Sequence, residues 1–227
     1  MAVVGLQDTF FRYAPAAPPL QSPAALFRSP MTKQYDRAYF QRWYRRSDIG
    51  GAQRLARKVA LALACAEYYL ERPVRSVLDI GCGEGAWRAP LLKLRPRVRY
   101  LGFDSSEFVV RQYGARRNLH LARFGDFAHL RPCPPVDLLV CADVLHYLPA
   151  RQLERGLPGL AELCGGVAFL ECFAAEDEFE GDRDGFQPRR ARWYRSRFGA
   201  QGLRSVGSHC WLGPALKADA AALERGD

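Results

Sequence analysis

The stretch "SVLDIGCGEGAW", from Ser76 to Trp87, places an apolar run directly before an aspartate and three alternating glycines. An apolar run that ends in a glycine-rich turn is typical of a buried parallel strand followed by a ligand-binding loop. Glycine lacks a Cβ atom, so it permits tight backbone dihedrals and a close approach of ligand to backbone. The stretch therefore predicts the first strand of an open α/β sheet, with a binding site at its carboxyl end.

The glycine spacing indicates which ligand this loop binds. Dinucleotide-binding loops read GxGxxG and hold a pyrophosphate at the following helix N-terminus. Here Gly81, Gly83 and Gly85 read GxGxG, and Asp79 stands two residues before the first of them. A carboxylate at this position repels a diphosphate and attracts an ammonium or sulfonium group. The loop therefore favours a cationic nucleoside over a dinucleotide.

The rest of the chain alternates between strand-like apolar runs and helical or loop-length connections. This alternation predicts an α/β fold, a doubly wound and mostly parallel sheet with helices on both faces. A last amphipathic helix is expected within residues 189–202, followed by a single further strand within residues 203–213. The predicted parallel strands are "RSVLDI" (75–80), "RVRYLGFD" (97–104), "LHLARFGD" (119–126), "VDLLVCAD" (136–143) and "GGVAFLECF" (165–173).

Composition divides the chain into three parts. Residues 1–30 are rich in Pro and Ala and show no periodicity, which indicates a disordered tail or a mis-assigned start, since Met31 is the only other methionine. Residues 31–74 carry two helical patterns and are expected to form an N-terminal helical cap or lid. Residues 75–227 are expected to form the ligand-binding α/β domain.

Two further acidic residues follow the next strands. Asp104 ends the second strand about 20 residues after the glycine loop, where a carboxylate can accept both ribose hydroxyls. The alternative for Asp104 is a helix N-cap, a role that the following Ser105 and Ser106 could fill equally well. Asp126 follows the third strand, where it could accept from an adenine amino group with Phe127 covering the ring. The alternative for Asp126 is an ordinary turn aspartate.

With the segment "CADVLHYLP" (141–149) after the fourth strand, four motifs stand in one order. From Arg75 to about Leu212 the chain resembles the class I S-adenosylmethionine-dependent methyltransferases, which implies a Rossmann-like fold and S-adenosyl-L-methionine as cofactor. The family usually has an antiparallel strand pair at the end, where a single strand is expected here. The resemblance implies that Asp79, Gly81, Cys82, Gly83 and Gly85 hold the methionine portion, Asp104 and Ser105 the ribose, Asp126 and Phe127 the adenine, and that Cys141, Ala142 and Asp143 line the floor beside the sulfonium.

Residues for catalysis and acceptor binding are less clearly marked. His146 lies in a connection that faces the site and is either a general base or a structural histidine. Tyr35, Tyr39, Trp43 and Tyr44 are spaced as one stripe of a helix. This stripe either packs in the core or forms a lid whose rings contact the sulfonium. Tyr147 and Trp193 are further candidates for the wall of the acceptor pocket.

The loop after the fifth strand, residues 174–186, carries six acidic residues and in this fold borders the acceptor. It would repel a phosphate backbone and tolerate a neutral or amine-bearing acceptor; a solvated loop is the alternative. The net charge of +9 does not indicate nucleic-acid binding, because only four of the 33 basic residues are lysines, a bias expected from GC-rich coding. A small-molecule acceptor is therefore predicted. A protein side chain, a non-catalytic cofactor-binding module and a nicotinamide oxidoreductase remain alternatives.

Other partners are not indicated. No apolar run approaches the roughly 20 residues that cross a bilayer, so no membrane association is expected. The seven cysteines form no CxxC pair, so neither a metal site nor a disulfide framework is predicted, and free thiols fit a cytoplasmic protein. The sequence does not indicate an oligomeric state.

Overall fold

The computed structural model describes residues 51–178 and 182–224. The expected tail and the aromatic stripe of Tyr35, Tyr39, Trp43 and Tyr44 lie outside these residues. The strands are β1 (Ser76–Ile80), β2 (Arg99–Asp104), β3 (Leu119–Leu121), β4 (Val136–Ala142), β5 (Cys164–Glu171), β6 (Arg204–Gly207) and β7 (Cys210–Leu212). The helices are α2 (Gly51–Leu70), α3 (Arg88–Leu94), α4 (Glu107–Arg117), α5 (Ala150–Leu163) and α6 (Ala191–Ala200), with short 3₁₀ turns η1 (Phe124–Ala128), η2 (Leu145–Tyr147) and η3 (Ala222–Glu224).

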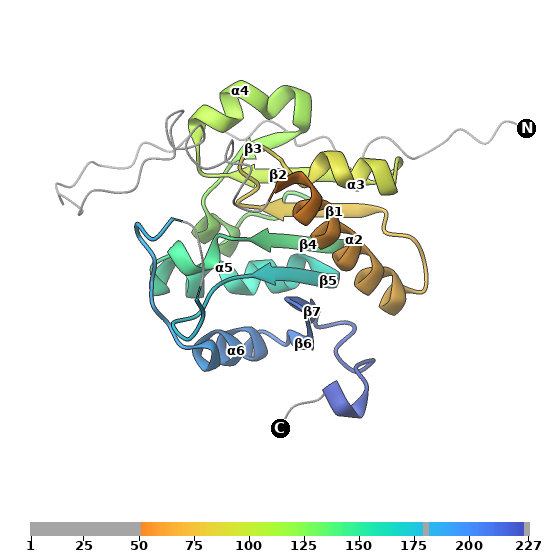
Figure 1. Cartoon of the computed structure of the whole chain (residues 1–227), viewed down its shortest axis with the longest axis vertical. Coiled ribbons are helices and arrows are strands. Elements are labelled where there is room, and N and C mark those ends of the chain that lie inside the picture. The colour runs from red at the N-terminus through yellow and green to blue at the C-terminus, as the bar shows by residue number, and fades with distance from the viewer. Residues whose placement is uncertain (1–50, 179–181, 225–227) are drawn as a thin grey trace, which may run out of the picture.

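The seven strands form one sheet in the order β3-β2-β1-β4-β5-β7-β6 (Figure 1). The first five are parallel, and β7 pairs antiparallel with both β5 and β6. This confirms the predicted α/β class with a mostly parallel sheet. The strand order reverses between β1 and β4, and ligands bind at such a switch point in open α/β sheets.

The expectation of a single last strand was wrong. Residues 203–213 form two strands, β6 and β7, joined by a tight turn in which Ser208 and His209 have φ of 47° and 65°. Tight hairpin turns need such positive φ values and usually carry Asn or Gly, so the Ser-His pair gave no recognisable turn signal. The third predicted strand is also shorter than expected, because the chain turns into η1 after β3.

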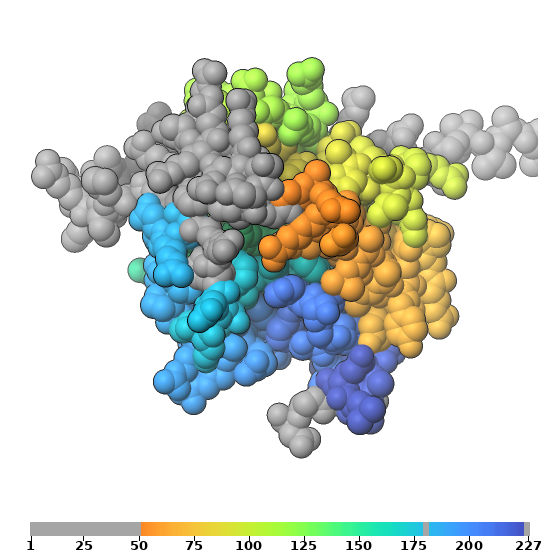
Figure 2. All heavy atoms as spheres, viewed as in Figure 1, coloured from red at the N-terminus to blue at the C-terminus, as the bar shows by residue number. Residues whose placement is uncertain are grey.

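Each face of the sheet is covered by its own layer of helices. α2 lies in front of the sheet in Figure 1 and buries Val59, Ala62, Leu63 and Ala66 in a core shared with β1, β4 and β5. The outer side of α2 remains exposed, and its first turns are visible in orange in Figure 2. The other face packs against η1, α5 and α6. α2 is thus a layer of the α/β domain, although it falls within the segment predicted as a cap.

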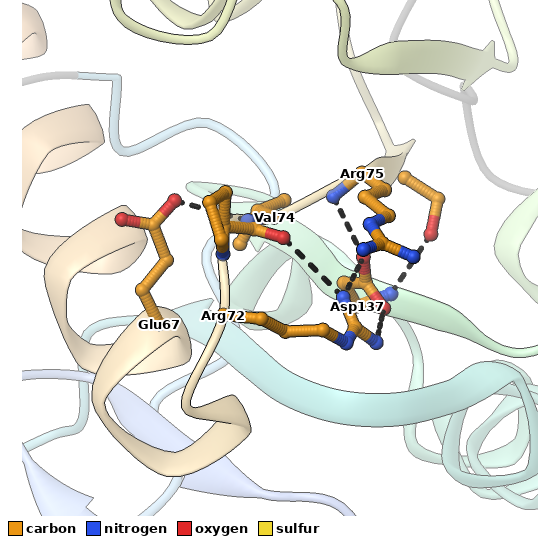
Figure 3. Close-up of polar contacts among 7 residues, drawn as sticks. Glu67, Arg72, Val74, Arg75 and Asp137 are labelled. Atoms are coloured by element: carbon orange, nitrogen blue, oxygen red, sulfur yellow. Dashed lines mark hydrogen bonds and ion pairs between the residues drawn. The ribbon is translucent and has the colours of Figure 1, made fainter.

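A cluster of polar contacts ties α2 to the amino ends of β1 and β4 (Figure 3). Asp137 of β4 accepts two hydrogen bonds from the Arg72 guanidinium, at 2.7 and 3.0 Å, and one from the backbone N–H of Arg75 at 2.7 Å. Glu67 of α2 accepts from the backbone N–H of Val74 at 3.0 Å. Burial by itself raises the pKa of Asp137, but the bonds from Arg72 and Arg75 hold that pKa below its usual value.

Replacing Asp137 by alanine is expected to lower the free energy of unfolding by about 1–3 kcal/mol at neutral pH, because three N–H donors lose a charged acceptor. The folded-state pKa is below the unfolded value, so this stabilisation is present above about pH 4 and is lost as the pH falls through the folded pKa. Urea unfolding followed by circular dichroism at several pH values measures it. Asp219→Ala, at an exposed position, is the control. A difference from wild type that stays constant down to pH 3 would contradict this role for Asp137.

Candidate active site

The candidate site lies where the carboxyl ends of β1, β2, β4 and β5 meet, beside the switch point of the sheet. The glycine loop leaves β1 there and is fixed to β2, since the backbone N–H groups of Gly81 and Cys82 both donate to the Phe103 carbonyl, at 2.7 and 3.0 Å. Gly81, Gly83 and Gly85 have φ of 76°, 52° and 73°. These are left-handed conformations, so the loop uses the backbone freedom of all three glycines.

Gly81 is also a point of close approach to the segment after β4. A Cβ atom at Gly81 would lie 2.3 Å from Cγ2 of Val144. The loop after β1 and the loop after β4 therefore pack directly on each other. At the other end of the glycine loop, Trp87 is buried and its ring lies 5.1 Å from that of Phe169 in β5.

Asp79 is buried near the end of β1, with 2% of its surface exposed. One carboxylate oxygen accepts a hydrogen bond from the Tyr100 hydroxyl at 2.6 Å. Burial raises the pKa of Asp79 to about 7, the nearby charge of Asp104 adds to this, and the Tyr100 hydrogen bond opposes it. A positively charged ligand group beside Asp79 would stabilise the ionised carboxylate.

Asp104, at the end of β2, is buried and accepts from the backbone N–H groups of Gly83 and Ser106, both at 2.8 Å. Burial raises the pKa of Asp104, and these backbone hydrogen bonds oppose the rise. Ser106 is the N-cap of α4, where its hydroxyl accepts from the N–H of Val109. The capping role considered for Asp104 thus belongs to Ser106, while Ser105 is exposed beside it. Asp104 links the strand to the glycine loop.

Asp126 and Phe127, the two residues expected around an adenine, differ in position: Asp126 is exposed and Phe127 is buried. Asp126 is exposed in η1, and its carboxylate accepts from the backbone N–H of Arg123 at 2.8 Å, as in an ordinary turn. Phe127 is fully buried in the core between β2 and α5, with its ring 5.5 Å from that of Phe103. The Phe127 ring therefore packs in the core and does not border the edge of the sheet.

The end of β4 brings one predicted residue to the surface and buries another. Cys141 is fully buried in the core on the α5 side. Ala142 is half-buried, and the side chain of Asp143 is 64% exposed with φ of 63°. The backbone N–H of Asp143 donates to the carbonyl of Glu171 at 2.9 Å, so the ends of β4 and β5 are held together.

His146 is fully buried and connects η2 to the loop after β5. Its Nδ1 accepts from the backbone N–H of Phe173 at 3.3 Å, and its carbonyl accepts from the N–H of Gln187 at 2.8 Å. Its Nε2 lies 3.4 Å from a carboxylate oxygen of Asp143. These contacts favour the structural interpretation of His146 over the general base.

Tyr147 and Trp193, the two acceptor-pocket candidates within the described residues, both make contacts with loop residues. The Tyr147 hydroxyl donates to the carbonyl of Asp182 at 2.6 Å. Trp193, on α6, is half-buried, and the guanidinium groups of Arg189 and Arg197 each lie 4.7 Å from its ring. Both residues therefore contact the segment between β5 and α6.

Glu171, Lys58 and Tyr100 were not predicted as residues of this site. Glu171 ends β5 and is paired with Lys58 of α2 at 2.6 Å, with only 6% of the Glu171 side chain exposed. Its signal was the same as for Asp104, an acidic residue at the carboxyl end of an apolar run. Tyr100 contacts Asp79 from β2, where it looked like an ordinary strand residue.

Within residues 51–178 and 182–224, no group of three or more His, Cys, Asp or Glu residues is arranged to hold a metal ion, and no helix is long and apolar enough to span a bilayer.

Comparison with known proteins adds to this geometry. Residues 78–166 match a family model described as a methyltransferase domain. Curated relatives include the trans-aconitate 2-methyltransferases of Rhodopseudomonas palustris, 35% identical over 98 residues, and Methylobacterium nodulans, 40% identical over 82 residues. These matches cover 41% and 35% of this chain, and only 37% and 31% of the relatives, respectively.

A solved structure described as an S-adenosylmethionine-dependent methyltransferase from Archaeoglobus fulgidus has the same fold, with a TM-score of 0.57 at 17% identity and 75% of each chain covered. The family model spans the glycine loop, Asp79 and Asp104, and the strand order and switch point agree with the fold. Residues 78–166 are therefore similar to a methyltransferase domain, and the described residues have the fold of S-adenosylmethionine-dependent methyltransferases.

Proposed function

We propose that this protein transfers the methyl group of S-adenosyl-L-methionine to a small-molecule acceptor that is neutral or carries an amine. The observation that carries the proposal is the pair of buried carboxyl groups, Asp79 and Asp104, on either side of a glycine loop at the switch point. The family model over residues 78–166 supports the same assignment.

The residues at this edge fit the cofactor. Asp79 is a buried carboxyl group whose pKa is raised chiefly by that burial, and an ammonium group of the ligand would favour its ionised form. Asp104 has acceptor oxygens for ribose hydroxyls at the end of β2. The left-handed glycine loop between them lets a ligand approach the backbone. When bound, the cofactor supplies a methyl group already activated by a positively charged sulfur.

The chain's own part in methyl transfer is then alignment and exclusion of water. Asp79 and Asp104 would orient the cofactor, and the loop after β4, which packs on Gly81, would set the floor beside it. His146 holds this loop to the segment after β5 through Phe173. No described side chain needs to form a covalent intermediate for the reaction.

The proposed acceptor class rests on the charges beside β5, where the acidic loop, Lys58 and Glu171 lie. Trans-aconitate, in the names of the relatives, is a carboxylate, but the family model ends at residue 166, before the acidic loop of this chain. Lys58, a cation on that side of the sheet, is paired with Glu171 at 2.6 Å. A polycarboxylate would therefore meet mostly negative charge, whereas a neutral or amine-bearing acceptor would not.

The proposal predicts the choice of cofactor. Calorimetry on the full chain should show micromolar binding of S-adenosylmethionine or its demethylated product S-adenosylhomocysteine, and no binding of NADH, because Asp79 at the loop disfavours a diphosphate. Tight NADH binding without binding of either nucleoside would contradict the proposal. Binding without methyl transfer to any acceptor would instead support a non-catalytic cofactor-binding module.

Replacing Asp104 by alanine is expected to weaken cofactor binding by about 2–4 kcal/mol, because charge-assisted hydrogen bonds to the ribose are lost. The same change removes the acceptor of Gly83 and Ser106, so the melting temperature should fall as well. Ser106→Ala separates the two effects, since it removes the α4 cap at a cost of about 1 kcal/mol of stability without touching the carboxylate. Calorimetry and thermal melts on both variants provide the comparison.

Unchanged affinity in a folded Asp104→Ala variant would exclude the ribose-binding role. If the alanine variant does not fold, Asp104→Asn tests the same role with a side chain of the same shape. Its neutral amide should still weaken binding, since it accepts weaker hydrogen bonds than a carboxylate.

A further inference from the structure

One face of β2 carries Tyr100, Gly102 and Asp104, because side chains alternate along a strand with a period of two. In the parallel pairing with β1, Val77 lies opposite Tyr100 and Asp79 lies opposite Gly102. Tyr100 is therefore two residues behind Asp79 in register. Its ring must extend along the face of β2 for the hydroxyl to reach the carboxylate.

Gly102 leaves space on this face of β2 for the Tyr100 side chain. A Cβ atom at Gly102 would lie 3.2 Å from the Tyr100 hydroxyl oxygen, 2.9 Å from Sγ of Cys82 and 2.7 Å from Cδ2 of Leu119. Gly102 does not have a positive φ, so backbone freedom is not what requires a glycine here. The missing side chain leaves the space that the Tyr100 hydroxyl occupies on its way to Asp79.

The Tyr100–Asp79 contact joins a buried hydrogen-bond donor, the Tyr100 hydroxyl, to a buried acceptor, the Asp79 carboxylate. Asp79 is 2% exposed and Tyr100 is 5% exposed, and the oxygens lie 2.6 Å apart. Burial first, and then the Asp79 charge, raise the pKa of Tyr100 well above its usual value, so the phenol stays protonated and donates. A buried carboxylate that accepts such a bond is stabilised relative to its protonated form.

Among the described residues, the other groups facing this pair do not supply a cation to Asp79. Asp104 of β2 contributes a like charge. The thiols of Cys82, in the glycine loop, and Cys141, in β4, have pKa values raised first by burial and then by Asp79, so both are neutral. Arg88 of α3 acts on Tyr100. Tyr100 is thus the described group whose hydrogen bond favours ionised Asp79.

We propose that Tyr100 is a positioning residue of the cofactor site, whose hydroxyl fixes the Asp79 carboxyl group beside the glycine loop and favours its ionised form for the ammonium group of the ligand. The absence of a side chain at Gly102 keeps the space beside this contact uncrowded. The proposal rests on the proposed S-adenosylmethionine function for its ligand, but the Tyr100–Asp79 coupling exists in the free protein.

The free protein gives the first test. The pKa of Asp79 in the folded state, about 7, is above its unfolded value of about 4, so the folded state binds the extra proton and stability falls as the pH rises between these values. Tyr100→Phe removes the bond that favours the charged form, so this fall should extend above pH 7. The loss of melting temperature caused by Tyr100→Phe should be larger at pH 8.5 than at pH 5.5.

Ligand binding gives the second test, with S-adenosylhomocysteine as the probe. The plot of affinity against pH for Tyr100→Phe should shift to higher pH by about one unit, which is a tenfold weaker Kd on the rising part of the curve below pH 7. The difference should shrink toward pH 8.5, where Asp79 ionises in both proteins. Calorimetry between pH 6 and pH 8.5 measures both curves.

Two variants control for simple loss of a hydroxyl and for the identity of the partner. Tyr113→Phe removes a hydroxyl from α4, where the ring contacts Arg117, and should leave both pH profiles unchanged. Asp79→Asn should remove the pH dependence of stability in this range, and Tyr100→Phe should add no further pH dependence to it.

Equal losses of melting temperature at pH 5.5 and 8.5, or parallel affinity curves, would overturn the proposal and leave Tyr100 as a core residue. A pH-dependent loss of stability together with no binding of the probe by any variant would keep the coupling but refute its role toward this cofactor, and with it the proposed function. The two failures are therefore distinguishable.

Discussion

The buried carboxyl group of Asp79 is the constraint on which the rest of the candidate site depends. An ionised carboxylate out of water is costly unless hydrogen bonds or a cation stabilise it. The surrounding chain provides one hydrogen bond, from Tyr100, and places Asp104 close enough to add a like charge. The glycine loop continues from this position with three left-handed residues, and Asp104 holds it through Gly83. A cationic nucleoside beside Asp79 would favour the ionised carboxylate.

The edge of the sheet has two halves, of which one lies within the segment matched by the family model and the other lies outside it. The cofactor half, from β1 to β4, lies within the segment matched by the methyltransferase family model. The proposed acceptor half comprises Lys58 of α2, which precedes the matched segment, and Glu171 and the acidic loop, which both follow it. The matches cover only part of each relative, so the acceptor in the relatives' names is not assigned to this chain, and the proposed neutral or amine-bearing acceptor rests on the charge of the chain's own residues.

Much of this was predictable from the sequence, because a parallel strand that ends in GxGxG has few alternatives and the acidic residues recur at strand ends. The fold class, the glycine loop and the positions of Asp79 and Asp104 at strand ends near the switch point followed from local pattern, but their burial did not. What failed depended on side-chain direction or on unusual turns. The orientation of the Phe127 ring into the core cannot be read from its position after Asp126, and the Ser208-His209 turn lacks the residues that mark a hairpin. The Tyr100–Asp79 contact depends on strand register, which only the assembled sheet defines.

Methyl transfer itself is the central claim. Its most direct test is to incubate the full chain with methyl-labelled S-adenosylmethionine and a mixture of small metabolites, and to follow the label by mass spectrometry. The expected result is S-adenosylhomocysteine formed in proportion to label on a neutral or amine-bearing compound, and neither product with Asp79→Asn. Label that stays entirely on a bound cofactor, with no S-adenosylhomocysteine formed in any mixture, would contradict the account.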